Sequence, residues 1–361
     1  MGSAPKIAID ARMVSRSGIG TCIQHWLRDV GYAVALGDPK DLDAYKEVPK
    51  HIPFISGIYG YKEQLKFPYS KLRKEKPDVL HIPHCNVPLF YRGKMIVTVH
   101  DLTHLVYPEF LPMKVVHLYF KFIFWFICKR ANRILTDSES TKRDLLRFYK
   151  ADESKMTVVP LGVGSEFVRK PKSDIEYLYE KFNIPRDKKI ILYVGNLLPH
   201  KNLNGLLEGF AQMEGRENCR LVLVGKAFDG RTRETREKDL GVENLTIHAG
   251  MVSQEDLVNF YNLADLFVLP SLYEGFGLPI LEAFACGTPV ACSNVSSLPE
   301  VGGNVAKYFD PKDAASIARA LENAIDDKGK YDSEIGAWVS KFTWENSARQ
   351  IREIAAEVAA K

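Results

Sequence analysis

The chain has 361 residues, of which 46% are hydrophobic and 26% are charged, enough apolar content to fill the cores of two domains. Its 49 Lys and Arg residues nearly balance its 45 Asp and Glu residues, and the net charge of +4 is too small to indicate a nucleic-acid partner. The sequence also lacks the motifs of nucleic-acid-binding domains. Its six scattered cysteines and the lack of a secretory signal predict a reduced, cytoplasmic protein without a disulfide framework or a cysteine metal site.

Short apolar runs alternate with helix-like segments along most of the chain. This alternation predicts parallel sheets covered by helices, the doubly wound α/β class. The expected strands are residues 6–10, 79–83, 95–99, 133–137, 157–163, 189–196, 221–226, 245–250, 266–269 and 288–292. The main expected helices are residues 22–30, 203–213, 253–264, 278–285 and 343–359. Residues 37–76 show little periodicity, and we assign no element there.

Gly18 and Gly20 stand in the turn between the first expected strand and the first expected helix. Glycines at this place let the backbone approach an anion or a sugar closely. A tight turn needs the same residues, and the full dinucleotide-binding fingerprint is absent. The pair alone therefore leaves both interpretations open.

Polar side chains directly follow two other expected strands, His84 to Asn86 after residues 79–83 and His100 with Asp101 after residues 95–99. Ligands of doubly wound sheets bind where the carboxyl ends of the strands meet. A single histidine at such a place is structural about as often as functional, so the position predicts no role by itself.

Residues 113–131 form an apolar and aromatic segment interrupted by Lys114, His117, Lys121, Lys129 and Arg130. These charges leave too little apolar length for a membrane-spanning helix, which needs about 20 residues. A helix buried beneath the sheet explains the aromatic residues most simply. An amphipathic helix lying on an anionic membrane surface is the alternative.

Residues 266–300 carry the strongest signal in the chain. An apolar strand, a polar turn with glycines and a helix with Pro279 in its first turn follow one another. Such a unit directs backbone N–H groups and the positive end of a helix dipole at one point. Two carboxylates, Glu274 and Glu282, frame the turn, although acidic residues near a helix start are common for electrostatic reasons alone.

The string EGFGLPILEAFACGTPVACS, with both glutamates, resembles the donor-binding signature of the family-4 retaining glycosyltransferases. TVHDLTHLVYPEF and HIPHCNVPL are also similar to segments of that family. The resemblance implies the GT-B fold, in which two Rossmann-like, doubly wound domains face a central cleft. It places an acceptor-side domain at residues 1–180 and a donor domain at 181–342, with a final helix at 343–361 that packs back on the first domain.

The resemblance also implies roles for individual residues. Catalytic roles fall on His100, near the transferred sugar, on Lys201, beside the diphosphate, and on Glu274, at a sugar hydroxyl. Glu282 would accept hydrogen bonds from the ribose. The implied donor-binding residues are Gly18, Gly20, Asn196, His200, Lys201, Gly225, Met251, Val252, Glu274, Gly275, Phe276, Gly277, Leu278 and Glu282.

Two of these positions keep an alternative. Lys201 could be a solvated lysine, but a lysine at a helix start opposes the helix dipole, which favours a role with phosphate. Asn196 stands where the family usually has an arginine. His200, Arg12 or Arg16 would then have to supply the second cation.

The activity that the resemblance implies is the transfer of a hexosyl unit from a nucleotide-diphosphate sugar, with retention at the anomeric carbon and without a divalent metal or another cofactor. GDP-mannose is the favoured donor, and a glycan or a lipid-linked saccharide is the expected acceptor. Such an acceptor would suit a peripheral contact of residues 113–131 with the inner face of the membrane. Two alternatives stay open, a nucleotide-sugar 2-epimerase of the same architecture and a non-catalytic binding partner of another transferase.

Overall fold

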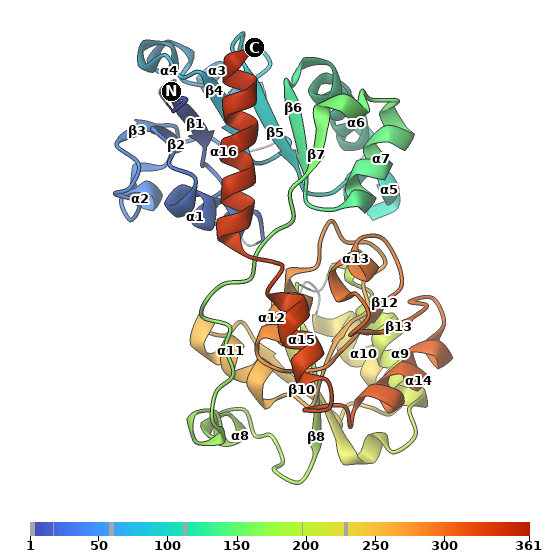
Figure 1. The fold of residues 1–361 in the computed structure, drawn as a ribbon. Helices are drawn as coiled ribbons and strands as arrows, with labels where there is room; N and C mark the ends of the chain where they lie inside the picture. The colour runs from blue at the N-terminus through green and yellow to red at the C-terminus, as the bar shows by residue number, and fades with distance from the viewer. Residues whose placement is uncertain (1–3, 17, 58–60, 111–113, 197, 227–229) are drawn as a thin grey trace. The chain divides into compact units, whose positions relative to one another are not determined.

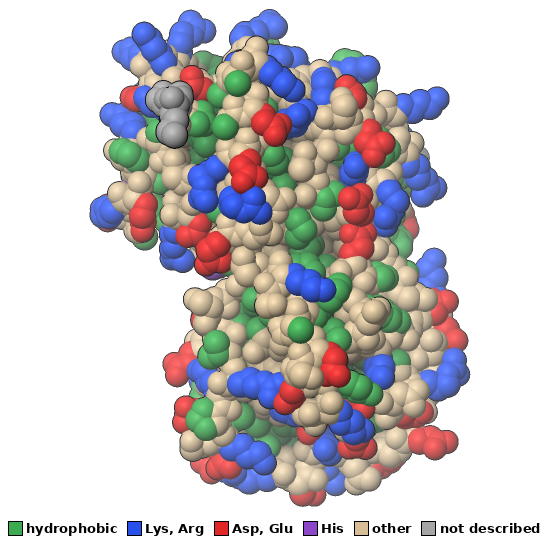
Figure 2. Space-filling model, in the orientation of Figure 1, with side chains coloured by type: hydrophobic (Ala, Val, Ile, Leu, Met, Phe, Trp, Pro, Cys, Tyr) green, Lys and Arg blue, Asp and Glu red, His purple; other side chains and the backbone are tan. Residues whose placement is uncertain are grey.

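The computed structural model describes residues 4–16, 18–57, 61–110, 114–196, 198–226 and 230–361. Met113, included in the aromatic segment above, lies outside the described residues. The chain forms two compact units, which are labelled by element in Figure 1 and drawn with side chains coloured by type in Figure 2. Unit 1 contains Met1–Gly162 and Thr343–Lys361, and unit 2 contains Val163–Phe342.

The division falls at Gly162, earlier than the boundary at residue 180 expected from the sequence. The segment after Gly162 packs on unit 2, because the backbone N–H of Lys170 donates to Asn262 Oδ1 at 2.7 Å and Tyr177 Oη donates to Asp256 Oδ1 at 2.6 Å. The two places where the chain passes between the units are joined by a hydrogen bond from the N–H of Val163 to the carbonyl of Phe342, at 3.2 Å.

Unit 1 is built on a parallel sheet, which has seven strands within the described residues, in the order β3-β2-β1-β4-β5-β6-β7. The order reverses between β1 and β4, whose register pairs Ile7 with Val79. Polar side chains that follow these two strands therefore meet at one edge. The strands are β1 (Ile7–Asp10), β2 (Val34–Gly37), β3 (Lys50–Pro53), β4 (Val79–Ile82), β5 (Met95–Val99), β6 (Arg133–Thr136) and β7 (Met156–Val158).

The C-terminal helix α16 (Trp344–Ala360) packs on α1 (Ile19–Asp29) in unit 1 (Figure 1). The buried indole of Trp26 donates to Ser347 Oγ at 3.0 Å, and the rings of His25 and Trp344 stack with centroids 4.4 Å apart. The remaining helices of unit 1 are α2 (Pro39–Leu42), α3 (Tyr61–Lys66), α4 (Tyr69–Glu75), α5 (Thr103–Val106), α6 (Lys114–Arg130) and α7 (Glu139–Tyr149), with 3₁₀ turns at Pro108–Phe110 and Glu153–Lys155.

Unit 2 has a second parallel sheet, with six strands within the described residues, in the order β10-β9-β8-β11-β12-β13. Here the order reverses between β8 and β11, where Leu266 pairs with Ile191. The strands are β8 (Lys189–Val194), β9 (Cys219–Val224), β10 (Thr246–Gly250), β11 (Leu266–Leu269), β12 (Val290–Ser293) and β13 (Lys307–Phe309).

Apolar side chains of the sheet and its helices form the core of unit 2, with Leu206, Phe210 and Leu321 fully buried. The helices are α8 (Tyr177–Lys181), α9 (Leu203–Gln212), α10 (Gly230–Leu240), α11 (Gln254–Leu263), α12 (Leu278–Ala285), α13 (Leu298–Gly302), α14 (Ala314–Ala324) and α15 (Asp332–Val339), with 3₁₀ turns at Lys172–Asp174, Pro199–Lys201 and Arg216–Asn218.

Three glycines stand at the carboxyl ends of β8, β9 and β10 and bring these ends close together. The N–H of Gly225 donates to the carbonyl of Gly250 at 2.8 Å, and Gly225 has a φ of +138°. A Cβ atom on Gly225 would lie 2.1 Å from the carbonyl oxygen of Gly195. Only glycine fits this position, because both the backbone conformation and the contact exclude a side chain.

We predict that Gly225→Ala lowers the free energy of unfolding by about 3 kcal/mol or more, since it adds a backbone clash to the strain of a positive φ. Gly241→Ala is the matched control, because Gly241 also has a positive φ, +65°, but open space around it. The control substitution should lower the free energy of unfolding by only about 1 kcal/mol. Urea denaturation followed by circular dichroism measures both, and equal losses in the two variants would contradict the close approach of Gly225 to Gly195.

Candidate active site

An ion pair joins the loops that follow β8 and β11, the two neighbouring strands at which the order of the unit 2 sheet reverses. Lys201 Nζ lies 2.7 Å from Glu274 Oε1 and 2.9 Å from Oε2, so the ammonium contacts both carboxylate oxygens. Both side chains are partly exposed, Lys201 at 23% and Glu274 at 14%. The pair is therefore desolvated enough to be ordered and open enough to meet a ligand.

Hydrogen bonds from three segments fix the loop that carries Glu274. Ser271 Oγ donates to Glu274 Oε1 at 2.6 Å, and the N–H of Glu274 donates to Ser296 Oγ at 2.9 Å. Asn202, directly after Lys201, donates through Nδ2 to the carbonyl of Pro270 at 3.0 Å. The carboxylate and the ammonium are thus positioned by neighbours that bear no charge themselves.

Helices α9 and α12 begin at this loop without a side-chain cap. Their N-cap residues are Asn202 and Gly277, and neither side chain bonds the first turn of its helix. Elsewhere in unit 2, Ser253 caps α11 and Asp313 caps α14, whereas α8, α13 and α15 also begin without a side-chain cap. Uncapped N-termini leave donor groups and a positive dipole end at the edge of the sheet, which is the electrostatic setting that binds phosphate.

Glu282 lies in α12 and accepts a hydrogen bond from the buried Tyr261 Oη at 2.7 Å. Burial raises the pKa of Glu282 to about 7, and this effect outweighs the hydrogen bond from Tyr261, which lowers the pKa. The nearby Glu166 carboxylate raises the pKa further. A buried carboxyl group whose pKa is raised toward neutrality, in the helix that follows the Glu274 loop, is a candidate ligand contact.

The other residues predicted to bind the donor also follow the strands of unit 2. Asn196 follows β8 and is exposed, and the carbonyl of His200 accepts a hydrogen bond from the N–H of Leu272 at 2.8 Å. Met251 and Val252 follow β10, and Met251 is 73% exposed. Gly275 and Leu278 flank the start of α12, and the ring of Phe276 is buried. The structure therefore brings this group to one edge of one sheet.

His100 lies in unit 1, directly after β5, and is held from both sides. Its Nδ1 lies 2.6 Å from Asp137 Oδ2 and its Nε2 lies 3.1 Å from the carbonyl oxygen of Pro83. Both partners present oxygen atoms, so His100 can donate to both of them when its two ring nitrogens are protonated. Burial disfavours the cation, but the Asp137 carboxylate raises the pKa of His100 above its usual value. His100 ties the ends of β4, β5 and β6 together.

Gly18 and Gly20 also lie in unit 1, at the start of α1. Gly18 is the exposed N-cap residue of α1, with a φ of +62° and no side-chain cap. Gly20 is buried, and a Cβ there would lie 2.7 Å from the carbonyl oxygen of Val14. Both glycines are thus required by the turn itself, whatever ligand it meets.

Arg12 is held in a buried cluster where the order of the unit 1 sheet reverses. Its guanidinium lies 2.7 Å from Asp10 Oδ2 and 3.2 Å from Glu63 Oε2, and it stacks over the ring of Phe54. Burial would raise the pKa of Asp10, but Arg12 and His84 hold it below its usual range. Arg12, one of the three candidates for the second cation, is thus already paired with two carboxylates inside unit 1. Arg16 is exposed.

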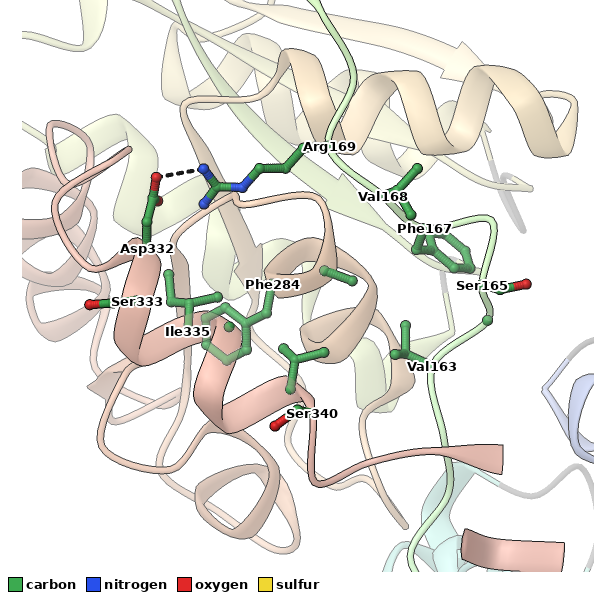
Figure 3. A pocket seen from close by; sticks show the side chains of 14 residues that line it. Val163, Ser165, Phe167, Val168, Arg169, Phe284, Asp332, Ser333, Ile335 and Ser340 are labelled. Carbon is green, nitrogen blue, oxygen red and sulfur yellow. Dashed lines mark hydrogen bonds and ion pairs between the residues drawn. The ribbon is translucent and has the colours of Figure 1, made fainter. Parts of the chain in front are cut away.

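A separate cavity of about 680 Å³ lies elsewhere on unit 2, as Figure 3 shows. Apolar side chains such as Phe167, Phe284 and Ile335 surround it, and the ion pair of Arg169 with Asp332 closes one end. It contains neither Lys201 nor Glu274. Its two charged lining residues, Arg169 and Asp332, are paired with each other.

Several residues of the site were missed in the sequence. Tyr261, Asn202 and Ser271 carry no motif of their own, and each acts through a contact that only the folded chain creates. Glu63 in unit 1 was missed for the same reason, because only the folded chain brings it to Arg12. The one available signal was position, since Ser271 follows a buried strand at its carboxyl end, where ligands of such sheets bind.

Comparisons with known proteins agree with this geometry. Residues 174–354 match the family described as glycosyl transferases group 1, and residues 28–167 match glycosyltransferase family 4. The O-antigen chain mannosyltransferase B of Escherichia coli is 30% identical over 285 residues, which cover 77% of this chain and 74% of that protein. The O-antigen chain mannosyltransferase RfbU of Salmonella typhimurium is 27% identical over 336 residues, or 92% of this chain and 87% of that protein.

A solved structure of Anabaena HepE in complex with UDP-glucose superposes with a TM-score of 0.78 at 18% identity, covering 98% of this chain and 100% of that one. Two doubly wound parallel-sheet units of this kind define the GT-B class of glycosyltransferases, and the fold expected from the sequence is confirmed. Within that class, the chain belongs to the group 1 and family 4 glycosyltransferases and is a glycosyltransferase. The epimerase alternative gains no support from these relatives.

We predict that Glu282 makes the protein less stable as the pH rises. The folded-state pKa of about 7 exceeds the usual value of 4.5, so the folded protein binds the proton more tightly than the unfolded chain. This contribution is fully present below the unfolded pKa and is lost as the pH rises through 7, a loss of about 2.5 kcal/mol between pH 5 and pH 8. Urea unfolding at the two pH values measures it.

Glu282→Gln is the control, because glutamine still accepts the hydrogen bond from Tyr261 but does not titrate. The variant should lose this part of the pH dependence. An unchanged dependence in the variant would show that Glu282 is not the titrating group.

Proposed function

We propose that this glycosyltransferase moves a hexosyl unit, mannose in the first instance, from a nucleotide-diphosphate sugar to a glycan or lipid-linked saccharide, with retention at the anomeric carbon. The observation that carries the proposal is the ion pair of Lys201 with Glu274 at the edge of the unit 2 sheet. The names of the two mannosyltransferase relatives support mannose, and GDP-mannose is the donor that we propose to test first.

The leaving diphosphate is the main electrostatic demand of such a transfer. A departing phosphate needs positive potential that is already in place before the bond breaks. Lys201 would turn from Glu274 to the phosphate oxygens, and the uncapped starts of α9 and α12 would add backbone N–H groups. We propose that these groups suffice without a divalent metal.

Glu274 would then accept a hydrogen bond from a hydroxyl of the transferred sugar. Its carboxylate is released when Lys201 moves to the phosphate, so one ion pair is exchanged for two contacts with the donor. Ser271 would keep the carboxylate in place during this exchange, and Ser296 would hold the backbone N–H of Glu274. Glu282 would accept hydrogen bonds from the ribose, which favours its ionised form.

The sugar loses its bond to the diphosphate while the acceptor oxygen attacks on the same face. Transfer of this kind depends on positioning and charge stabilisation, since no protein group has to form a bond to the sugar. His100 is proposed as a positioning residue on the acceptor side, because its ring nitrogens hold Asp137 and Pro83 in the structure.

We predict that Lys201→Ala and Glu274→Ala each lower the turnover of the donor by at least about 100-fold, the usual cost of losing one stabilising group in a transfer site. Thermal stabilisation by a panel of GDP-mannose, UDP-glucose and dTDP-rhamnose identifies the donor for this assay. Release of nucleoside diphosphate then measures turnover.

Lys189→Ala is the matched control. Lys189 begins the strand whose far end leads to Lys201, and it pairs with Asp265 at 3.4 Å. The control should keep normal turnover because it lies at the opposite edge of the sheet. Near-normal rates in both site variants, or no stabilisation by any nucleotide sugar, would exclude the proposed function.

A further inference from the structure

Helix α6 presents an unusual row of exposed apolar side chains. Val115, Leu118, Phe122 and Trp125 are 62%, 66%, 46% and 48% exposed. Their spacing of three, four and three residues places them on one side of the helix. Soluble proteins rarely leave such a contiguous set of large apolar groups in water, so a row like this marks a surface that contacts something.

The opposite side of α6 is anchored in unit 1. Phe120, Ile123, Phe124 and Ile127 are buried in the core of the unit, and α6 also contacts α7. Tyr119 Oη donates to Glu63 Oε1 at 3.4 Å, which links the helix to the buried cluster around Arg12. The core therefore explains one face of the aromatic segment and leaves the other face, from Val115 to Trp125, without a role.

All charged side chains of α6 are basic. It contains Lys114, Lys121, Lys129 and Arg130 and no acidic residue. Lys121 and Lys129 are exposed on the same side as the apolar row. Arg147 and Lys150, at the end of the neighbouring α7, are exposed as well, next to Phe148, which is 42% exposed.

We propose that this face of α6 binds an anionic membrane surface. Aromatic and aliphatic side chains would enter the boundary between headgroups and acyl chains, and the lysines would reach the lipid phosphates with their flexible stems. A second copy of the chain fits less well, because a symmetric contact would bring the lysines of both copies together. Within the described residues no helix is long and apolar enough to cross a bilayer, so the contact lies in the interface plane.

The test uses the full chain with vesicles of phosphatidylcholine alone or of phosphatidylcholine with phosphatidylglycerol. Flotation should recover the protein with the anionic vesicles only, and NaCl at about 1 M, where the Debye length is about 3 Å, should release most of it. Trp125 is the exposed tryptophan of the four, since Trp26 and Trp344 are buried and Trp338 is half-buried. Its emission should shift to the blue on binding, and Trp125→Phe should abolish the shift while the protein still floats.

A triple variant, Leu118→Ser with Phe122→Ser and Trp125→Ser, should lower the partition coefficient by at least about 100-fold, since three apolar groups no longer enter the bilayer. The control, Val168→Ser with Tyr331→Ser, removes exposed apolar groups from unit 2 and should bind as the wild type does. Unchanged thermal unfolding and unchanged stabilisation by the donor show that the triple variant is folded. Because the proposed donor site lies in unit 2, a triple variant that still binds the donor also shows that loss of membrane binding is separate from the proposed function.

Three results would overturn the proposal. The protein would not float with anionic vesicles, or it would float equally with phosphatidylcholine alone, or the triple variant would bind as the wild type does. Sedimentation of the wild type as a dimer that the triple variant converts to a monomer would assign the face to a second copy instead.

Discussion

A lysine ammonium and a glutamate carboxylate that stand 73 residues apart in the chain neutralise one another at the edge of the unit 2 sheet. Each partner offsets part of the other's desolvation cost at this partly exposed place. The arrangement depends on β8 and β11 being neighbours, and on Asn202, Ser271 and Ser296 fixing the loops. A donor that brings both phosphate and hydroxyl groups can replace this pair without leaving a charge uncompensated.

The two units differ in how they pair the charged side chains at the point where the strand order of each sheet reverses. In unit 1, the charges at the reversal of strand order are buried, and Arg12 pairs with both Asp10 and Glu63. In unit 2, the corresponding charges are half-exposed and joined by a single pair. A closed cluster holds a scaffold in shape, whereas an open pair can exchange partners. This contrast supports the proposal that unit 2 recognises the charge of the donor.

The sequence predicted the central strands and the donor loop well, since residues 266–269 and 278–285 have the bounds that the structure shows. Long apolar runs in buried parallel strands explain this success. The sequence did not predict β2, β3 and β13. Of these, β3 and β13 are edge strands of four and three residues with few buried side chains. The sequence also did not indicate Tyr261 and Glu63, because their contacts with Glu282 and Arg12 join segments whose pairing depends on the fold.

Calorimetric titration of the two site variants Lys201→Met and Glu274→Gln tests the exchange of partners most directly. Lys201→Met should weaken the binding of the nucleoside diphosphate and of the nucleotide sugar alike, because both carry the phosphates. Glu274→Gln should weaken the nucleotide sugar only, and should leave the nucleoside diphosphate bound as tightly as before or more tightly, because Lys201 is then free of its partner. If Glu274→Gln weakens both ligands equally, or Lys201→Met weakens neither, the ion pair is not the element that recognises the donor.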